Sequence, residues 1–226
     1  MSSIIGRLIA KDLYFYRWLI AGTPTVGIAS LLVSHFVERD HVRGGANLGI
    51  LLFITTVVAF GVFIPMFGIF KERQDKSQLF VLSLPVSTSH YVIAKISAAL
   101  IAFLVPWLVL TATVVVVTVV SGGPLGGMPS FLAMMTFFLA TFCMLTALIV
   151  MTTSEAWAIA GILITNVLVT IYFARIGNLP GIAAHTRDAT ATWSSTVLLV
   201  LAVEIALIVL SLVLAFSLAS RRKDFV

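Results

Sequence analysis

The histidine and carboxylate side chains are the groups in this sequence that are able to do acid–base or metal chemistry. The four histidines, His35, His41, His90 and His185, lie near the ends of apolar runs or in loops, without the spacing of a ligand set. The chain contains no H-E-x-x-H zinc helix, no G-x-S-x-G nucleophile elbow and no G-x-x-x-x-G-K-[ST] phosphate loop. Asp12, Glu38, Asp40 and Asp188 lie beside basic residues and are expected to be solvated charges. The sequence therefore predicts no catalytic residue and no metal site.

The longest charged and polar stretch between two apolar runs is KERQDKSQLFVLSLPVSTSHYVIAK, at positions 71–95. Its beginning is charged and its middle is apolar. Pro85 disfavours helical geometry at Leu84, so a short helix over 72–84 is expected to end there, and a hydroxyl residue at 87–89 can cap the next helix. Because a solvated loop has no reason to carry apolar side chains, they are expected to pack on the ends of the chain's own helices or on another protein.

Three further polar residues lie in or beside apolar runs. Glu204 is inside the last run, where an ionisable group costs about 2.5–3.5 kcal/mol. It either faces a water-filled path or a subunit interface, or it bonds to a neighbouring helix. Asn166 lies in the middle of its run and is able to bond across helices. Glu155 opens a run, where a negative charge favours the helix N-terminus, and a contact with a cytoplasmic partner is the alternative.

The elements that position these residues follow from composition. The 226 residues are 60% hydrophobic and 10% charged, whereas an ordinary soluble domain has about 25% charged residues. Too few polar side chains are present to cover a soluble surface, so the chain is expected to be an integral membrane protein. The net charge of +5 does not indicate nucleic-acid binding, because the basic residues flank apolar runs. The single cysteine, Cys143, has no intrachain disulfide partner.

Six runs approach or exceed the roughly 20 apolar residues that cross a bilayer. They cover about 18–36, 46–70, 91–120, 130–152, 156–174 and 195–219, and the Gly- and Pro-rich SGGPLGGMP turn separates the third run from the fourth. The β-branched run at 111–120 would favour a strand in water, but an open strand leaves backbone groups unpaired in lipid, so a helix is expected. The fold class predicted is an all-α integral membrane protein with six transmembrane helices, forming one domain over 1–226. The loop at 174–193 is long enough to hold a short surface or re-entrant helix.

The segment at 4–17 precedes the first span and has apolar residues at helical spacing on one face, with Arg7 and Lys11 on another. This pattern predicts an N-terminal amphipathic interfacial helix, and a polar start to the first span is the alternative. With both termini in the cytoplasm, the inner segments hold ten Lys and Arg residues and the outer loops four. The excess predicts cytoplasmic termini and a cytoplasmic segment at 71–87.

The stretch at 71–95 resembles the corresponding cytoplasmic segment of permease subunits of type-2 ATP-binding-cassette (ABC) exporters. That segment has an acidic residue after the second span, a hydroxyl residue, an apolar run, a Pro-Val-Ser step and a Lys that opens the third span. The matching residues are Glu72, Ser77, those at 79–84, Pro85, Val86, Ser87 and Lys95. Many members have Gly where this chain has Lys76. The layout of an interfacial helix, six spans and cytoplasmic ends extends the resemblance over the whole chain.

The resemblance implies that this segment acts like a coupling helix, which docks on a separate ATPase subunit. The chain itself is then a non-enzymatic permease subunit of an exporter, and ATP and Mg are bound by two copies of the partner ATPase. A second permease chain, identical or homologous, the lipid bilayer and the plasma (inner) membrane of a prokaryote complete this expectation, with no nucleic acid. The residues implied in ATPase coupling are Glu72, Asp75, Lys76, Ser77, Leu79, Phe80, Leu82, Leu84, Pro85 and Glu155, and Glu204 and Asn166 are the candidates for the pathway or the subunit interface. A non-transporting structural or signalling membrane subunit and, less favoured, a membrane-embedded enzyme are the alternatives.

Overall fold

The computed structural model describes residues 2–37, 48–70, 88–152, 154–186 and 188–221, and these contain helices and turns but no strand. The elements are α1 (Ser2–Val37), α2 (Leu48–Pro65), the π-helical turn η1 (Met66–Phe70), α5 (Thr88–Val120), the 3-10 turn η2 (Leu125–Gly127), α6 (Met128–Met151), α7 (Glu155–Ile176), α8 (Pro180–Ala183) and α9 (Ser195–Arg221). Six of these helices are long and apolar enough to cross a membrane. The predicted all-α fold with six transmembrane helices is thus confirmed.

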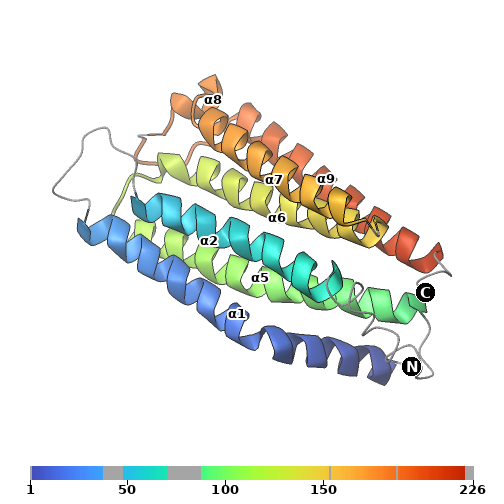
Figure 1. The fold of residues 1–226 in the computed structure, drawn as a ribbon. Coiled ribbons are helices and arrows are strands. Elements are labelled where there is room, and N and C mark those ends of the chain that lie inside the picture. The colour runs from blue at the N-terminus through green and yellow to red at the C-terminus, as the bar shows by residue number, and fades with distance from the viewer. Residues whose placement is uncertain (1, 38–47, 71–87, 153, 187, 222–226) are drawn as a thin grey trace.

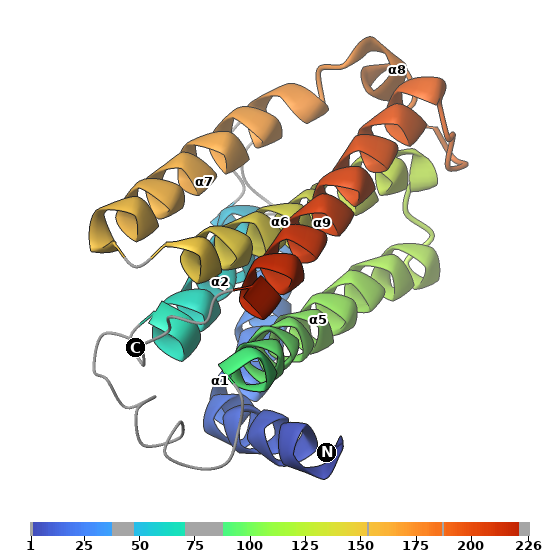
Figure 2. The ribbon, with the colours of Figure 1, turned by 90° about the vertical axis from the view of Figure 1, so that its right-hand side faces the viewer.

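The six long helices form one elongated bundle. The first turns of α1 and the last turns of α9 lie at the same end, which we call the terminal end (Figure 1). Viewed along the bundle, α6 lies in the middle, with α7 and α9 on one side and α2 and α5 on the other (Figure 2). Helix α1 packs on α2 and α5. Helix α6 therefore contacts helices on both sides of the bundle, and α5 also contacts α9 directly.

The β-branched run at 111–120 is helical, as predicted, and forms the last turns of α5. Its threonine hydroxyls donate to carbonyl oxygens one turn earlier in the same helix: Thr111 to Trp107, Thr113 to Val109 and Thr118 to Val114, at 2.7–2.8 Å. Each hydroxyl is satisfied without a partner outside the helix. The threonines therefore do not prevent this helix from lying in an apolar environment.

Three phenylalanines from three helices form the centre of the core. The ring centroid of Phe103 on α5 lies 6.1 Å from that of Phe60 on α2 and 4.2 Å from that of Phe142 on α6, and all three side chains are buried. Nearby, the indole Nε1 of Trp107 donates to the carbonyl oxygen of Met135 at 2.7 Å. These contacts fix α2, α5 and α6 against one another.

Two turns close the end of the bundle opposite the terminal end. Helix α5 ends at Val120, and the φ of 65° at Gly122, two residues later, permits the bonds from Gly122 N–H to Val119 O and from Gly123 N–H to Thr118 O. The N–H of Gly126 then donates to Asp188 O at 2.9 Å, so the 121–129 turn is bonded to the loop between α7 and α9. That loop contains the four-residue helix α8, which lies in the 174–193 stretch that is long enough to hold a short helix.

The segments at 4–17 and 18–36 are continuous in the structure. Both belong to α1, which contains Pro24 and bends along its length (Figure 1). Proline removes a backbone N–H and is the common cause of such bends. The predicted amphipathic segment is therefore the first part of a single long helix.

The approach of α2 to α1 requires a glycine at position 49. A methyl group there would lie 2.5 Å from the backbone oxygen of Ser30 and 2.5 Å from the backbone nitrogen of Ser34. Since backbone atoms cannot move aside separately, we expect Gly49→Ala to separate the helices and lower the free energy of unfolding by about 1–3 kcal/mol. Thermal unfolding of the purified protein in detergent measures the loss. The matched control is Gly22→Ala on α1, where no atom lies within 4 Å of the added methyl group, and equal melting temperatures for the two variants would contradict the prediction.

Candidate functional site

The segment that the sequence identifies as a coupling helix lies outside the described residues. Nine of the predicted coupling residues fall in it: Glu72, Asp75, Lys76, Ser77, Leu79, Phe80, Leu82, Leu84 and Pro85. The structure does describe both of its flanks, namely η1 before it and the start of α5 after it, and both lie at the terminal end (Figure 1). These two flanks therefore form the described part of the candidate site.

The flank before the segment is a turn of π-helix. Pro65 ends α2, and the five residues Met66–Phe70 continue it with π-helical hydrogen bonding. Gly68, within this turn, is in contact with the hydroxyl of Tyr16, and a methyl group at position 68 would overlap that oxygen. Tyr16 is 3% exposed. Thus α1 packs directly on the backbone that leads into the segment.

The flank after the segment is held by an ion pair. Lys95, in the second turn of α5, donates from Nζ to Asp12 Oδ1 on α1 at 2.9 Å, and the two side chains are 7% and 5% exposed. The ammonium group also lies 5.7 Å from the ring centroid of Tyr91. Two charges this deeply buried are stabilised only by each other and by nearby hydrogen bonds, so the geometry is tightly determined.

Asp12 and Tyr16 are four residues apart and therefore lie on the same face of α1. One helix face thus contacts both flanks of the 71–87 segment, and we call these two residues the α1 clamp. The expectation that Asp12 is a solvated charge is wrong: the residue is 4% exposed and paired. The sequence contains a signal for this, because helical spacing places Asp12 among the apolar residues of the 4–17 segment, where an acid needs a buried partner.

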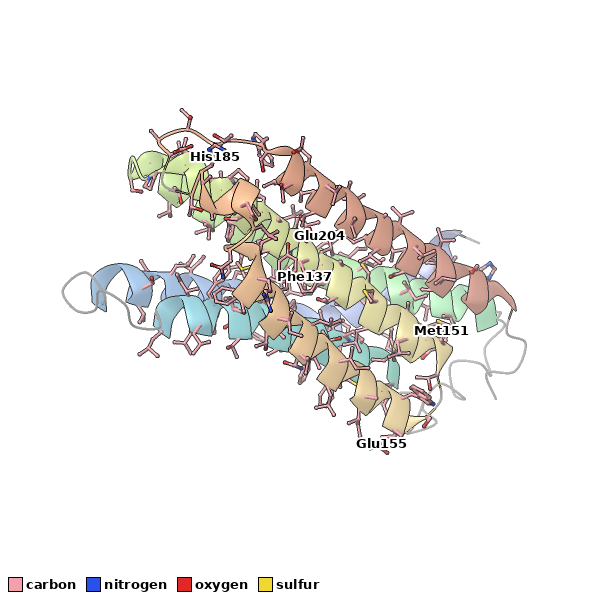
Figure 3. All side chains as sticks on the ribbon, turned by 90° about the horizontal axis from the view of Figure 1, so that it is seen from above. Phe137, Met151, Glu155, His185 and Glu204 are labelled. Carbon is pink, nitrogen blue, oxygen red and sulfur yellow. The ribbon has the colours of Figure 1, made fainter. Side chains whose placement is uncertain are left out.

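Glu155 is the predicted coupling residue that the structure describes. It is the first residue of α7, follows the N-cap residue Ser154, and is exposed. This position at a helix N-terminus is the one that the dipole argument predicts. In Figure 3, Glu155 and Met151 lie together at one end of the bundle and His185 lies at the other.

Glu204 lies in the middle of the bundle, near Phe137 (Figure 3). Its side chain is 3% exposed, and its Oε1 accepts a hydrogen bond of 2.5 Å from the hydroxyl of Tyr172 on α7. The Tyr172 ring stacks on Phe137 of α6, with the centroids 3.9 Å apart. The other oxygen, Oε2, is buried with no hydrogen-bond partner among the described residues. Glu204 therefore joins α9 to α7 inside the bundle and does not face an open path in this structure.

Asn166 lies on the exposed side of α7. Its Nδ2 donates to Ile162 O at 2.9 Å, so the bond is made within its own helix. The side chain lines a cleft of about 560 Å³ between α2 with η1 and α7, together with Thr55, Thr170 and a largely apolar wall. A second cleft, of about 340 Å³, lies between α6, α7 and α9 and is mostly lined by Leu and Met side chains.

His185 and Asp188, in the described part of the loop at the opposite end, pair with each other. His185 Nδ1 lies 2.8 Å from Asp188 Oδ2, and both side chains are partly exposed. Asp188 is thus a partly solvated charge with a histidine neighbour. Across the described residues, no group of three or more His, Cys, Asp and Glu side chains is close enough to hold a metal ion.

The buried ion pair leads to a prediction on stability. Asp12→Asn or Lys95→Gln leaves the other charge buried without its partner, and we expect each to lower the free energy of unfolding by about 3–5 kcal/mol. The exchanged pair Asp12→Lys with Lys95→Asp should recover part of this loss, because it restores opposite charges. Thermal melts in detergent of the parent, the two single variants and the double variant Asp12→Asn with Lys95→Gln give the coupling energy. Additive losses in the doubly substituted protein would show that the two side chains do not interact.

The hydrogen bond between α7 and α9 is tested in the same assay. Tyr172→Phe removes the donor to Glu204 and leaves both carboxyl oxygens without a partner among the described residues, so we expect a loss of about 1–3 kcal/mol. Tyr14→Phe, on an exposed ring, is the matched control and should leave the melting temperature unchanged. Glu204→Gln keeps an acceptor for the tyrosine and should lose less than Tyr172→Phe.

Comparison with known proteins assigns a family to this arrangement. The family model described as "ABC-2 family transporter protein" matches residues 8–220. This range includes the α1 clamp, both flanks of the 71–87 segment, Glu155, Asn166 and Glu204. The comparisons with curated proteins and with solved structures gave no match. Because the matched region covers nearly the whole chain, including all six spans, this chain belongs to the ABC-2 transporter family and is a membrane-spanning permease component of an ABC transporter.

Proposed function

We propose that this chain is the permease subunit of an ABC exporter, which moves its cargo outward with ATP hydrolysed by a separate ATPase subunit. The observation that carries the proposal, beside the family, is the α1 clamp. Tyr16 contacts the π turn before the 71–87 segment, and Asp12 pairs with Lys95 after it. Displacement of the segment by a partner would therefore act on α2, α5 and α1 together, which is what a coupling element has to achieve.

The ATPase is proposed to contact two places at the terminal end. The first is the 71–87 segment, through the charged residues Glu72, Asp75 and Lys76, Ser77, and the apolar residues that end at Pro85. The second is Glu155, which is exposed at the start of α7. The family's permease chains lack an ATP-binding site of their own, so ATP and Mg belong to the ATPase, which we propose is present in two copies.

A second permease chain, identical or homologous, is proposed to complete the translocation unit. Asn166 and Thr170 are exposed on α7 in the middle of the chain's fifth span, beside the 560 Å³ cleft. Lipid chains offer no hydrogen bond to the side-chain oxygen Oδ1 of Asn166. Polar groups at this depth normally face a protein or a water-filled cavity. We therefore place the subunit interface or the cargo path at this surface. Glu204 is proposed to contribute to this surface through Tyr172, whose hydroxyl binds the Glu204 carboxylate to α7.

The chain is proposed to lie in the plasma membrane of a prokaryote with both termini in the cytoplasm. With this orientation the inner segments of the sequence hold ten Lys and Arg residues and the outer loops hold four, and this excess supports it. The 71–87 segment and Glu155 are then on the side where ATP is available.

The docking role is tested by co-purification with the ATPase. We expect Phe80→Asp and Leu82→Asp to reduce the recovered ATPase by about tenfold or more, because each places a charge where an apolar side chain has to fill a cleft on the partner. The experiment co-expresses the tagged chain with the ATPase of the same exporter and measures both subunits after affinity purification.

The matched control is Leu82→Met, which retains an apolar side chain of similar size and should retain the ATPase. Size-exclusion chromatography and melting temperature establish that each variant is folded. Full recovery of the ATPase with folded Phe80→Asp and Leu82→Asp proteins would exclude the docking role of this segment.

A further inference from the structure

The first turns of α1 present a second face, opposite the α1 clamp. Five large side chains of this face are exposed to the surroundings of the bundle: Arg7, Lys11, Tyr14, Arg17 and Trp18. At 3.6 residues per turn they lie on one side of the helix, about half a turn from Asp12. We call these five residues the basic–aromatic face. Tyr14 and Trp18 are 66% and 75% exposed, so nothing among the described residues covers it.

The three cations of this face have no acidic partner among the described residues. Asp12 is the sole acid in the sequence of α1, and its carboxylate is buried on the other side of the helix with Lys95. The Arg17 guanidinium lies instead over aromatic rings, 4.0 Å from the centroid of Tyr14 and 5.4 Å from that of Trp18. The face therefore carries three positive charges that are not neutralised by its own helix.

The spacing of these residues places constraints on how α1 meets the bilayer. Arg7 and Arg17 are ten residues apart, which is about 15 Å along a helix. The headgroup layer on one side of a bilayer is only about 5–8 Å thick. A helix parallel to the membrane normal would hold only one of the two arginines in this layer, whereas a helix that runs obliquely along the interface holds both. The bend in α1 is compatible with such an oblique start (Figure 1).

We propose that the basic–aromatic face of α1 binds the headgroups of anionic phospholipids. The phosphodiester of such a lipid supplies the negative charge that the cations lack, and Tyr14 and Trp18 occupy the boundary between headgroups and acyl chains, where such rings are enriched. The surface is a property of the permease alone. Because the opposite side of the same turns holds both flanks of the 71–87 segment, the bound lipid fixes the position of the α1 clamp relative to the membrane surface.

The test measures lipid preference by quenching of Trp18 fluorescence in vesicles without any ATPase. The full chain carries Trp157→Phe and Trp193→Phe, which removes the other two exposed indoles, and the signal of the same protein with Trp18→Phe, in which only the half-buried Trp107 remains, is subtracted. It is reconstituted in phosphatidylcholine, and brominated phosphatidylglycerol or brominated phosphatidylcholine is then titrated in. We expect the phosphatidylglycerol to bind more tightly, and each of Arg7→Gln, Lys11→Gln and Arg17→Gln to weaken that preference by up to about fivefold. Added salt should weaken the preference for phosphatidylglycerol in the parent protein. It should have no effect on the triple variant, in which all three cations are replaced by Gln.

The matched control is Arg175→Gln, which removes an exposed cation at the opposite end of the bundle and should leave the preference unchanged. Circular dichroism and melting temperature establish that the variants are folded, as expected for exposed side chains. A triple variant that keeps the full preference overturns the proposal. So does a parent protein that does not distinguish the two lipids, since the face would then be covered by protein, such as the acidic residues of 71–87 or another chain. Neither result bears on ATPase docking, which the co-purification measures separately.

Discussion

The buried ion pair between Asp12 and Lys95 determines how the first part of the chain is arranged. Removing two opposite charges from water is costly, and the cost is offset only when the partners meet at hydrogen-bond distance. The 2.9 Å contact therefore fixes α1 on α5 at one point, and the contact of Tyr16 with Gly68, one helical turn away, fixes it on the end of α2. Helix α1 thus contacts both described flanks of the segment that connects α2 to α5.

One path from this region to the rest of the bundle runs through the aromatic core, and α5 also contacts α9 directly. The stacked rings of Phe60, Phe103 and Phe142 connect α2 and α5 to the central helix α6. From α6, the stacked Phe137 and Tyr172 rings and the bond to Glu204 continue to α7 and α9. A displacement of the described ends of α2 and α5 would therefore reach close-packed surfaces, which transmit displacement because they have little free volume to absorb it. The two clefts lie beside this path, along α7.

The number and kind of helices could be predicted from the sequence because lipid removes the competing structures. The run at 111–120 illustrates this: its β-branched residues favour a strand, but the need to pair every backbone group decides for a helix. Pairings between distant residues could not be predicted in the same way. The Asp12–Lys95 pair spans 83 positions, and the Tyr172–Glu204 bond depends on which faces of α7 and α9 turn inward. The spacing of apolar residues along the sequence indicates that one face of a helix is apolar, but it does not indicate which other helix that face contacts.

The π turn between Pro65 and the 71–87 segment has a further mechanical meaning. Its hydrogen bonds span five residues where those of an α-helix span four, so the turn contains one residue more than α-helical winding needs. Rewinding it would release that residue into the connection and rotate everything beyond it by about 100°. The turn thus holds one residue and about 100° of rotation that α-helical winding would release, at the junction between a membrane helix and the segment proposed to dock on the ATPase.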